Sequence, residues 1–570
     1  MISKKKLVFI ISPFVLLIIL LIMNGVLFSS VARTESVWMD SPLGEKVYGC
    51  LYHPKNPHPS RPIVIVFHGL SWTGTLDMRW PLELTKRGFY VLSVDQSGHG
   101  FTHGNQPGLQ DDVLKPFFFR NVIGVVDYIY SRQDLFNISA IGCMGVSLGG
   151  WTTVMGTVVE PRINASVSLA GPTNITKLSE DTDFSRLWRN IGVTPENDFI
   201  EIPELARNHS AVEFWNGSYG VNPPKNLLLI QGTNDPTVNV SHTIDAYNLV
   251  NDSTKCDMFL VEGGDHALIN NAVVNETIVW FETKLLGGIQ GPIEFSQFTY
   301  IQVYFVYIMT LIGIYSSVFG VCFTFFKLKD KYIKTSKNSI PTKSSEEKTY
   351  VMALLKVILY SLPILGIWIV LYFMQGVVFN YLIVLLLGAA LLAVYEALFF
   401  LFKSRDCFSG ENLKQVLKSQ FGFYDAIIAI ACAAYFLGFY YSVAYYFKFL
   451  MISPQSIELY FLSLLAILPF FFSFEIFHRN LIQNQFPTRS ERGKWVNRIL
   501  LFGFAVISFF PFYYITMGAY MSVLIMFLFM IAVTTISIYL YEKTQKTFVT
   551  ALFNSIVVAF FLAHHYFFFI

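Results

Sequence analysis

From residue 298 to its end, the sequence is dominated by apolar segments separated by polar connections. A bilayer core requires about 20 consecutive apolar residues arranged as a helix. We therefore predict eight membrane-spanning helices in this region, at residues 298–326, 349–372, 375–402, 421–447, 450–476, 499–516, 518–541 and 547–570. A composition of 53% hydrophobic and 14% charged residues excludes an ordinary soluble protein of a single domain.

A further apolar segment, residues 7–29, follows the N-terminal lysines and predicts a signal anchor within residues 1–29. The residues Ser29-Ser30-Val31-Ala32 resemble a cleavage site, so removal of this segment remains an alternative. Between the anchor and the C-terminal spans, residues 30–297 carry 18 Lys and Arg against 28 Asp and Glu, whereas the rest of the chain carries 23 against 11. This charge difference predicts an acidic soluble domain joined to a basic membrane domain at 298–570.

The loops between the predicted spans indicate how the chain crosses the membrane. Four alternate loops are rich in Lys and Arg, while the intervening connections contain only Lys448. Basic loops remain on the cytoplasmic side, so nine spans place the N-terminus in the cytoplasm and the soluble domain outside or in a lumen. We predict a multi-pass protein, most simply of the cell membrane.

Glycosylation sequons independently favour this orientation. They begin at Asn137, Asn164, Asn174, Asn208, Asn216, Asn239, Asn251 and Asn275, and none lies after residue 300. Chance explains two or three such motifs, whereas eight indicate a glycosylated surface facing the outside or a lumen. An archaeal cell surface and a eukaryotic secretory membrane both fit.

The soluble domain alternates short apolar strands with helical patterns. Strands are predicted within "RPIVIVFHG", "FYVLSVD", "SAIGCMGVS", "INASVSLAG", "NLLLIQG" and "CDMFLVEGG", and helices at residues 75–87, 111–132, 148–159 and 267–286. Continuous apolar strands joined by helices predict an α/β fold with a mostly parallel sheet covered on both faces.

The motif Gly145-Val146-Ser147-Leu148-Gly149 lies where a predicted strand meets a predicted helix. A nucleophile elbow requires small residues on both sides of its serine and presents the hydroxyl above the sheet. Small residues are also common at strand-to-helix turns without any catalytic role, so this motif alone decides little.

Three further positions support a reactive serine. The backbone N–H groups of Leu70 and Leu148 could form an oxyanion hole, with His68 either bracing the Leu70 loop or ending a strand. Asp235 and His266 each follow a later strand, in the order Ser-Asp-His that this type of sheet uses.

Other polar residues compete for these roles, namely Asp95, His99 and Asp265. Asp265 is adjacent to His266 along the chain, which is a poor geometry for orienting its ring. We therefore assign the acid to Asp235.

The segments "FHGLSWTG", "LTKRGFYVLSVDQSGHGFTHG", "GCMGVSLGG", "GTNDPTV" and "GGDHA" resemble the α/β-hydrolase superfamily, nearest to its serine aminopeptidase and monoglyceride-lipase-like members. The resemblance covers residues 45–288, about half of the chain, and departs from the family pattern at Ser97, where an arginine is usual. It implies acyl transfer to Ser147, with His266 as base and then acid, and assigns Asp95 a role in structuring its loop.

Residues 172–222 interrupt the strand pattern and predict a cap, with Trp188, Phe214 and Trp215 as candidate pocket residues. A surface insertion whose aromatic side chains pack on the sheet is the alternative.

Ionisable residues inside the predicted spans include Glu396, Glu475 and the pair His564-His565. Glu475 and Arg479 distantly resemble a motif of intramembrane prenyl-protein proteases, but both lie near the basic end of a span, where an interfacial ion pair is the simpler interpretation.

The cysteines show no metal-site spacing, and Cys143 is predicted to be a core residue. We expect no metal and no cofactor.

The leading hypothesis is a membrane-anchored serine hydrolase that cleaves an ester or a peptide bond. The expected partners are an ester, lipid or peptide substrate and membrane lipids, with no nucleic acid and an unidentified protein partner for the membrane domain. Acyl transfer to an acceptor other than water would use the same residues. A catalytically silent binding module on a multispan transporter or receptor is the alternative from another class.

Overall fold

The computed structural model describes residues 4–70, 72–102, 117–179, 203–215, 224–293, 298–332, 390–391, 394, 420–444, 454–477, 479, 499 and 520–564. The chain divides into two compact units. We call residues 22–307, 444–455 and 570 the sheet unit, and residues 1–21, 308–443 and 456–569 the helical unit. Two long helices, α1 (Lys4–Val31) and α11 (Thr299–Tyr332), contribute residues to both.

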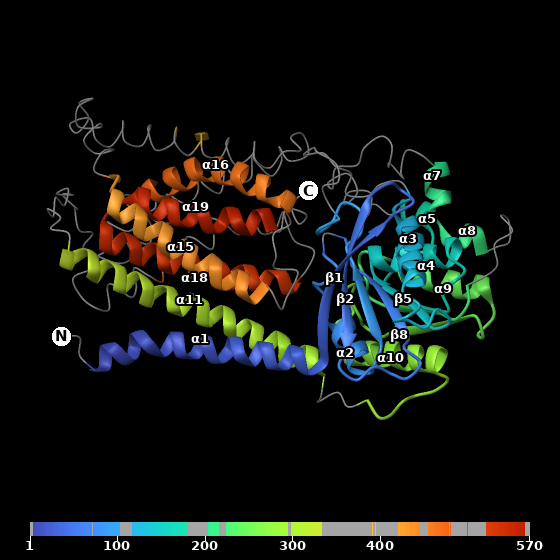
Figure 1. The fold of residues 1–570 in the computed structure, drawn as a ribbon. Coiled ribbons are helices and arrows are strands. Elements are labelled where there is room, and N and C mark those ends of the chain that lie inside the picture. Colours follow the sequence, from blue (N-terminus) through green and yellow to red (C-terminus); the bar gives the residue numbers. More distant parts are fainter. Residues whose placement is uncertain are drawn as a thin grey trace. The chain divides into compact units, whose positions relative to one another are not determined.

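One eight-stranded sheet forms the centre of the sheet unit (Figure 1). Its strands are β1 (Ala32–Asp40), β2 (Lys46–Pro54), β3 (Ile63–Phe67), β4 (Tyr90–Val94), β5 (Ile141–Val146), β6 (Ala165–Leu169), β7 (Leu227–Gly232) and β8 (Cys256–Val261). They lie in the order β1-β2-β4-β3-β5-β6-β7-β8, and only the pairs β1–β2 and β2–β4 are antiparallel. The predicted, mostly parallel sheet is therefore present. At one edge it carries two further strands, the antiparallel pair β1 and β2, which was not predicted.

Helices cover both faces of this sheet, which explains why β3 to β7 consist entirely of buried residues. The described helices of this unit are α2 (Arg79–Lys86), η1 (Phe118–Arg120), α3 (Asn121–Ser131), α4 (Leu148–Val159), α5 (Ile175–Ser179), α7 (Pro203–Asn208), α8 (Ala211–Trp215), α9 (Ser241–Val250) and α10 (Asn271–Leu286). Helices α2 and α10 contact each other, and α3 and α4 contact each other (Figure 1). Edge strand β1 instead alternates exposed and buried residues.

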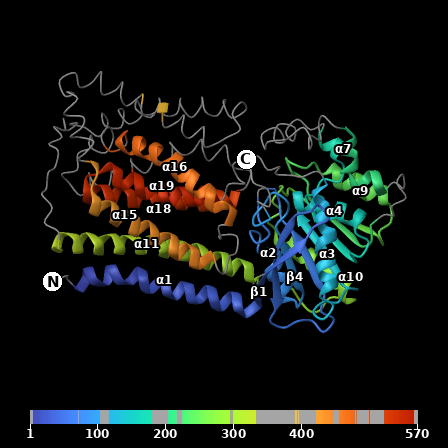
Figure 2. The ribbon, with the colours of Figure 1, turned by 45° about the horizontal axis from the view of Figure 1, so that its top comes forward.

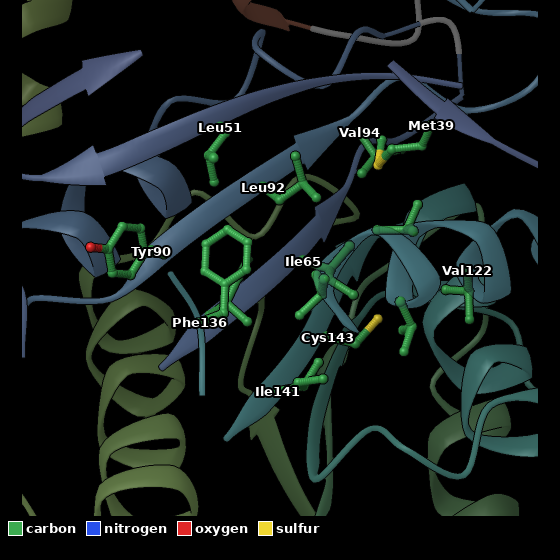
Figure 3. Close-up of a cluster of buried hydrophobic side chains, with 14 of the residues drawn as sticks. Met39, Leu51, Ile65, Tyr90, Leu92, Val94, Val122, Phe136, Ile141 and Cys143 are labelled. Atoms are coloured by element: carbon green, nitrogen blue, oxygen red, sulfur yellow. The ribbon is translucent and has the colours of Figure 1, made fainter. Parts of the chain in front are cut away.

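The apolar core between the sheet and α3 is shown in Figure 3. Side chains of β1 to β5, including Ile65 and Leu92, pack here against one face of α3, which contributes Val122. Cys143 of β5 is fully buried in the same cluster and is a free thiol, as the apolar surroundings in the sequence predict.

The helical unit contains the first part of α1 and the last part of α11, together with α15 (Phe423–Ala444), α16 (Pro454–Phe477), α18 (Tyr520–Thr544) and α19 (Thr547–His564). Figures 1 and 2 show α1 and α11 side by side, and Gly313 of α11 lies against Leu17 of α1. Within the described ranges, three helical segments are long and apolar enough to cross a membrane, namely Ile11–Val31, Thr299–Asp330 and Phe423–Tyr441.

Six described helices coincide with six of the nine predicted spans, namely α1, α11, α15, α16, α18 and α19. The predicted span at 349–372 lies outside the described residues. The same holds for the span at 375–402 apart from residues 390, 391 and 394, and for the span at 499–516 apart from residue 499. Glu396 and His565 also lie outside them.

Buried polar side chains join three helices of this unit. The Glu475 carboxylate accepts hydrogen bonds from Arg479 Nε, Ser537 Oγ, Thr550 Oγ1 and Asn554 Nδ2, at distances of 2.6–3.0 Å. Both charged residues are buried, so the ion pair belongs to an internal network between α16, α18 and α19. Its position at the membrane interface stays a prediction.

Candidate active site

The turn between β5 and α4 places Ser147 at the carboxyl end of the central strands. Its backbone has φ 56° and ψ −113°, a conformation that side-chain-bearing residues rarely adopt. The flanking chain is very close, since a Cβ on Gly149 would lie 2.1 Å from the carbonyl oxygen of Phe67, and one on Gly145 would lie 2.3 Å from the backbone of Gly149. Only glycine fits at these two positions, so the motif has the steric requirements of a nucleophile elbow.

Hydrogen bonds connect Ser147, His266 and Asp235 in series. His266, in the loop between β8 and α10, places Nε2 2.8 Å from Ser147 Oγ. Its Nδ1 lies 2.7 Å from Oδ2 of Asp235, in the loop between β7 and α9. Because a carboxylate only accepts, Nδ1 carries the proton and Nε2 is free to accept from the serine hydroxyl. The structure therefore brings together the three side chains that the sequence predicted to be neighbours.

The Asp235 carboxylate is held by four donors. Besides His266 Nδ1, the backbone N–H groups of Thr237 and Val238 donate to Oδ1, at 2.8 and 3.0 Å, and Gln231 Nε2 donates to Oδ2 at 2.7 Å. Burial of the group favours its neutral form, but the His266 interactions and the two backbone hydrogen bonds outweigh burial and lower the pKa of Asp235 from its ordinary value. The carboxylate is consequently ionised at neutral pH and can stabilise a positive charge on His266.

The sequence of this domain is similar to that of known proteins. The profile of the prolyl oligopeptidase family matches residues 76–286. A Bacillus subtilis (strain 168) protein named "Putative esterase YitV" is 25% identical over 247 residues, which cover 40% of this chain and 92% of that protein. The domain belongs to the α/β-hydrolase superfamily and is a serine hydrolase.

Similar solved structures include two peptidases and one esterase. They are a Mycobacterium tuberculosis puromycin-hydrolyzing peptidase (20% identity, TM-score 0.35, 45% of this chain), a Pyrococcus horikoshii acylaminoacyl peptidase (18%, 0.38, 47%) and the Pyrococcus furiosus esterase Pf2001 (17%, 0.34, 45%). This chain covers 39% and 45% of the two peptidases and 94% of the esterase.

Other carboxylates of the α/β-hydrolase domain bind the backbone. Asp95 accepts from the N–H groups of Gly74 and Phe101, at 2.6 and 2.7 Å, and so holds its loop closed. Its burial raises its pKa to about 6 despite these hydrogen bonds. Asp265 accepts from the N–H groups of Ala267 and Leu268. Asp235 is therefore the carboxylate that hydrogen-bonds to His266 within the described residues.

The loop after β3 carries Leu70 close to the elbow. His68 stabilises this loop because its Nδ1 donates to the carbonyl of Gly69 and its Nε2 accepts from the N–H of Gln96. Burial and the neighbouring ring of His99 keep the pKa of His68 well below its usual value, so the ring is neutral. Leu70 packs against the apolar cluster that contains Leu148, the first residue of α4.

The described part of the predicted cap consists of α5, α7 and α8, whereas Trp188 lies outside the described residues. Trp215 is buried and Phe214 half-buried, and both pack in the cluster around Trp151 of α4. In the described part of residues 172–222, Phe214 and Trp215 thus pack over the sheet. This agrees with the alternative prediction, a surface insertion whose aromatic side chains pack on the sheet.

Sequon asparagines are distributed over the surface of the domain. Asn239 and Asn251 are exposed, five others are partly buried, and Asn216 lies outside the described residues. Asn164 accepts a hydrogen bond from the N–H of Ile141 and so also joins two strands.

Two residues near this site were not predicted. Gln231, the penultimate residue of β7, places its amide against Asp235, and Arg79 donates to the backbone of the His266 loop. Neither residue belongs to a recognisable motif, and Arg79 is 189 residues away from its partner Leu268 in the sequence.

Proposed function

We propose that this protein is a membrane-anchored serine hydrolase whose hydrolase domain faces away from the cytoplasm. Its nucleophile is Ser147, its general base is His266, and Asp235 orients His266. The observation that carries the proposal is the unbroken series of hydrogen bonds from Ser147 Oγ through His266 to Asp235. A binding module without catalytic activity has no requirement for such a series.

In the acylation step, the Ser147 oxygen attacks the carbonyl carbon of the substrate while its proton moves to His266 Nε2. The buried carboxylate of Asp235 stabilises the imidazolium that forms. The negative charge that develops on the carbonyl oxygen is stabilised by the N–H of Leu148, at the first turn of α4, and by the N–H of Leu70. The first N–H groups of a helix have no partner within the helix, so the N–H of Leu148 is suited to this role.

His266 then donates its proton to the leaving alcohol or amine, and an acyl group remains on Ser147. His266 Nε2 then takes a proton from a water molecule, whose oxygen attacks the acyl carbon. The bond from that carbon to Ser147 Oγ breaks, the acid leaves, and His266 returns the proton to Ser147 Oγ. Acyl transfer to another acceptor would differ only in the molecule that replaces this water.

We propose a substrate with an apolar acyl group, because the half-buried Leu70 beside the elbow and the core behind it are apolar. Leu148 and Trp151 belong to a buried cluster with Phe118 and Phe119, and the half-buried Leu70 packs against it. We propose esters or amides of this kind as the substrate class, including lipid esters. The esterase and peptidase names of similar proteins are consistent with either bond type.

The membrane topology is part of the same proposal. The basic loops and the position of the sequons support nine spans, a cytoplasmic N-terminus, and a glycosylated hydrolase domain outside the cell or in a lumen. Glycosidase treatment tests this orientation in a eukaryotic expression host. Replacing the exposed Asn239 and Asn251 with glutamine should remove two glycosidase-sensitive steps in mobility, and an unglycosylated wild type would contradict the orientation.

The catalytic proposal is tested by labelling isolated membranes with a fluorophosphonate probe. Wild type should be labelled rapidly, His266→Ala only at a slow residual rate, and Ser147→Ala not at all. Thermal unfolding of each variant in detergent establishes that the fold is retained. Folded wild-type protein that neither labels nor hydrolyses p-nitrophenyl butyrate would refute the hydrolase and favour the silent binding module.

A further inference from the structure

The loop that carries His266 is held from a direction unrelated to Ser147 and Asp235. Two residues beyond His266, Leu268 is buried and adopts a left-handed backbone conformation with φ 48°. Its carbonyl oxygen accepts hydrogen bonds from Arg79 Nη1, at 3.0 Å, and from the N–H of Asn270, at 2.9 Å. The strained turn between His266 and α10 is therefore fixed by a side chain from the start of α2.

Arg79 is itself immobilised. Its Nε and Nη2 bind the Asp77 carboxylate at 2.6–3.1 Å, and Trp80 Nε1 donates to the same carboxylate at 2.9 Å. Burial opposes the charge, but the adjacent Asp77 outweighs burial and raises the pKa of Arg79. A buried, bidentate ion pair of this kind has one geometry, so the third arm of the guanidinium points at Leu268 in a fixed direction.

The first two turns of α11 hold the segment that carries this ion pair. Tyr304 Oη donates to the carbonyl of Leu76 at 3.0 Å and accepts from the N–H of Met78 at 3.1 Å, so one hydroxyl spans the residues on both sides of Asp77. One turn earlier, Tyr300 Oη donates to Oδ1 of Asn271, the first residue of α10, at 2.9 Å. Helix α11 thus contacts both the Arg79 segment and the helix that follows the His266 loop.

We propose that Arg79 and Tyr304 are positioning residues for His266, and that the start of α11 thereby sets the geometry of the active site. The inference rests on the proposed function, in which His266 is the general base. Helix α11 continues from these tyrosines through a segment long and apolar enough to cross a membrane. A displacement or rotation of this helix would be transmitted through Tyr304 and Arg79 to the Leu268 carbonyl, and so to the distance between His266 Nε2 and Ser147 Oγ.

Arg79→Lys and Tyr304→Phe test the inference in the full-length protein in detergent. Lysine retains a positive charge beside Asp77 but cannot bind it bidentately and reach Leu268 as well, and phenylalanine retains the ring while losing both hydrogen bonds. Misplacement of a general base affects the chemical step, so we expect Arg79→Lys to lower kcat by roughly 10- to 100-fold and Tyr304→Phe by roughly 3- to 10-fold, while KM changes by less than about threefold.

Matched controls separate positioning from general stability. Arg87, just beyond the other end of α2, makes a bidentate ion pair with buried Glu282 and donates to two carbonyl groups, but does not contact the His266 loop. Tyr128 of α3 accepts one hydrogen bond through its hydroxyl, from Arg132 at 3.3 Å, so phenylalanine removes a tyrosine hydroxyl contact there as well. Arg87→Lys and Tyr128→Phe should leave kcat within about twofold of wild type, since neither change reaches the active site.

A second measurement asks whether the effect passes through His266. The slow residual reaction of His266→Ala with a fluorophosphonate should not fall further when Arg79→Lys or Tyr304→Phe is added. Equal losses in the Arg79 and Arg87 variants, unchanged kcat in a folded Arg79→Lys protein, or full additivity with His266→Ala would overturn the inference. Absence of activity in wild type would remove the proposed function as well, and so differs from these outcomes.

Discussion

Replacing Asp235 with asparagine tests whether Asp235 must fix the tautomer and orientation of the His266 ring, or need only lie beside it. In wild type, Oδ1 of Asp235 faces two backbone donors, the N–H groups of Thr237 and Val238, and Oδ2 faces His266 Nδ1. The Oδ2 atom also accepts from Gln231 Nε2. The amide oxygen of an asparagine should nevertheless occupy the Oδ1 position, because the two backbone N–H groups there can only donate, whereas His266 can change its tautomer and Gln231 can reverse its amide. Its NH₂ group then faces His266 Nδ1 and donates to it.

This reversed hydrogen bond selects the wrong tautomer of His266. With Nδ1 as the acceptor, Nε2 carries the proton and cannot accept one from Ser147. We expect kcat to fall by roughly 10⁴-fold, or about 5 kcal/mol in activation free energy. If Gln231 reverses its amide, its Oε1, which has no hydrogen-bond partner among the described residues, can accept from the new NH₂ group, but the hydrogen bond from Gln231 Nε2 to the carbonyl of Val238 is lost. We therefore expect the fold to be retained with a loss of roughly 1 kcal/mol in unfolding free energy.

The assay is hydrolysis of p-nitrophenyl butyrate by purified protein, with thermal unfolding measured in parallel. Asp265→Asn is the matched control, because this neighbour of His266 only accepts from backbone N–H groups, and an asparagine oxygen can do the same. Its kcat should stay within about threefold of wild type. An Asp235→Asn enzyme that keeps more than about a tenth of its kcat, or a larger loss in Asp265→Asn, would refute the reasoning.

Three other predictions concern the fold and its stability. Gly149→Ala should destabilise the protein by more than about 3 kcal/mol or prevent folding, because the added Cβ would lie 2.1 Å from fixed backbone. On the same helix, Gly156→Ala has its nearest contact at 3.5 Å and should be neutral or stabilising by up to about 1 kcal/mol. Equal unfolding midpoints of the two variants would contradict the close approach at Gly149. Burial raises the pKa of Asp95 from 3.8 to about 6, so between pH 4 and 6 the folded state binds more protons than the unfolded state. The protonated carboxyl contributes about 3 kcal/mol to the free energy of unfolding below pH 4, and this contribution is lost as the pH rises to 6. Relative to Asp95→Asn, wild type should lose unfolding free energy between these pH values, and a constant difference would contradict the shift. The Sγ atoms of Cys322 in α11 and Cys432 in α15 are 3.0 Å apart. Copper phenanthroline should therefore oxidise the two thiols to a disulfide, with loss of two hydrogens. If both thiols still react with maleimide after this treatment, the packing is contradicted.

The central strands could be predicted because they are buried on both faces and their sequences are continuously apolar. The edge pair could not, since β1 alternates exposed and buried residues and includes charged ones, and β2 is interrupted by Gly49. At Gly49 the side chains of Leu92 and Met39 approach within 3.0 Å of the Cβ position, a requirement that only the folded sheet reveals.

Helix α2 begins at Arg79, four residues later than the predicted start at residue 75. The preceding residues make other hydrogen bonds instead, Leu76 with Tyr304 of α11 and Asp77 with Arg79, two residues further along the chain. These partners compete with helical hydrogen bonds, and those from α11 are more than 200 residues away in the sequence.

At the site, the order of Ser147, Asp235 and His266 along the chain was sufficient to predict their proximity, because each follows a strand of one sheet at its carboxyl end. The same reasoning could not find Arg79 or Gln231, whose contacts are with backbone and amide groups and leave no motif.

The crowding of backbone around Gly149 has a consequence for how related sequences should be interpreted. A substitution of Ser147 or His266 removes a reacting group without moving the chain, whereas a larger residue at Gly145 or Gly149 displaces the strands themselves. A lineage that abandons catalysis can therefore drift at the serine and the histidine while both glycines persist. In a genome survey, the glycines would identify proteins that keep this sheet, and the serine with its histidine would identify those that still perform chemistry.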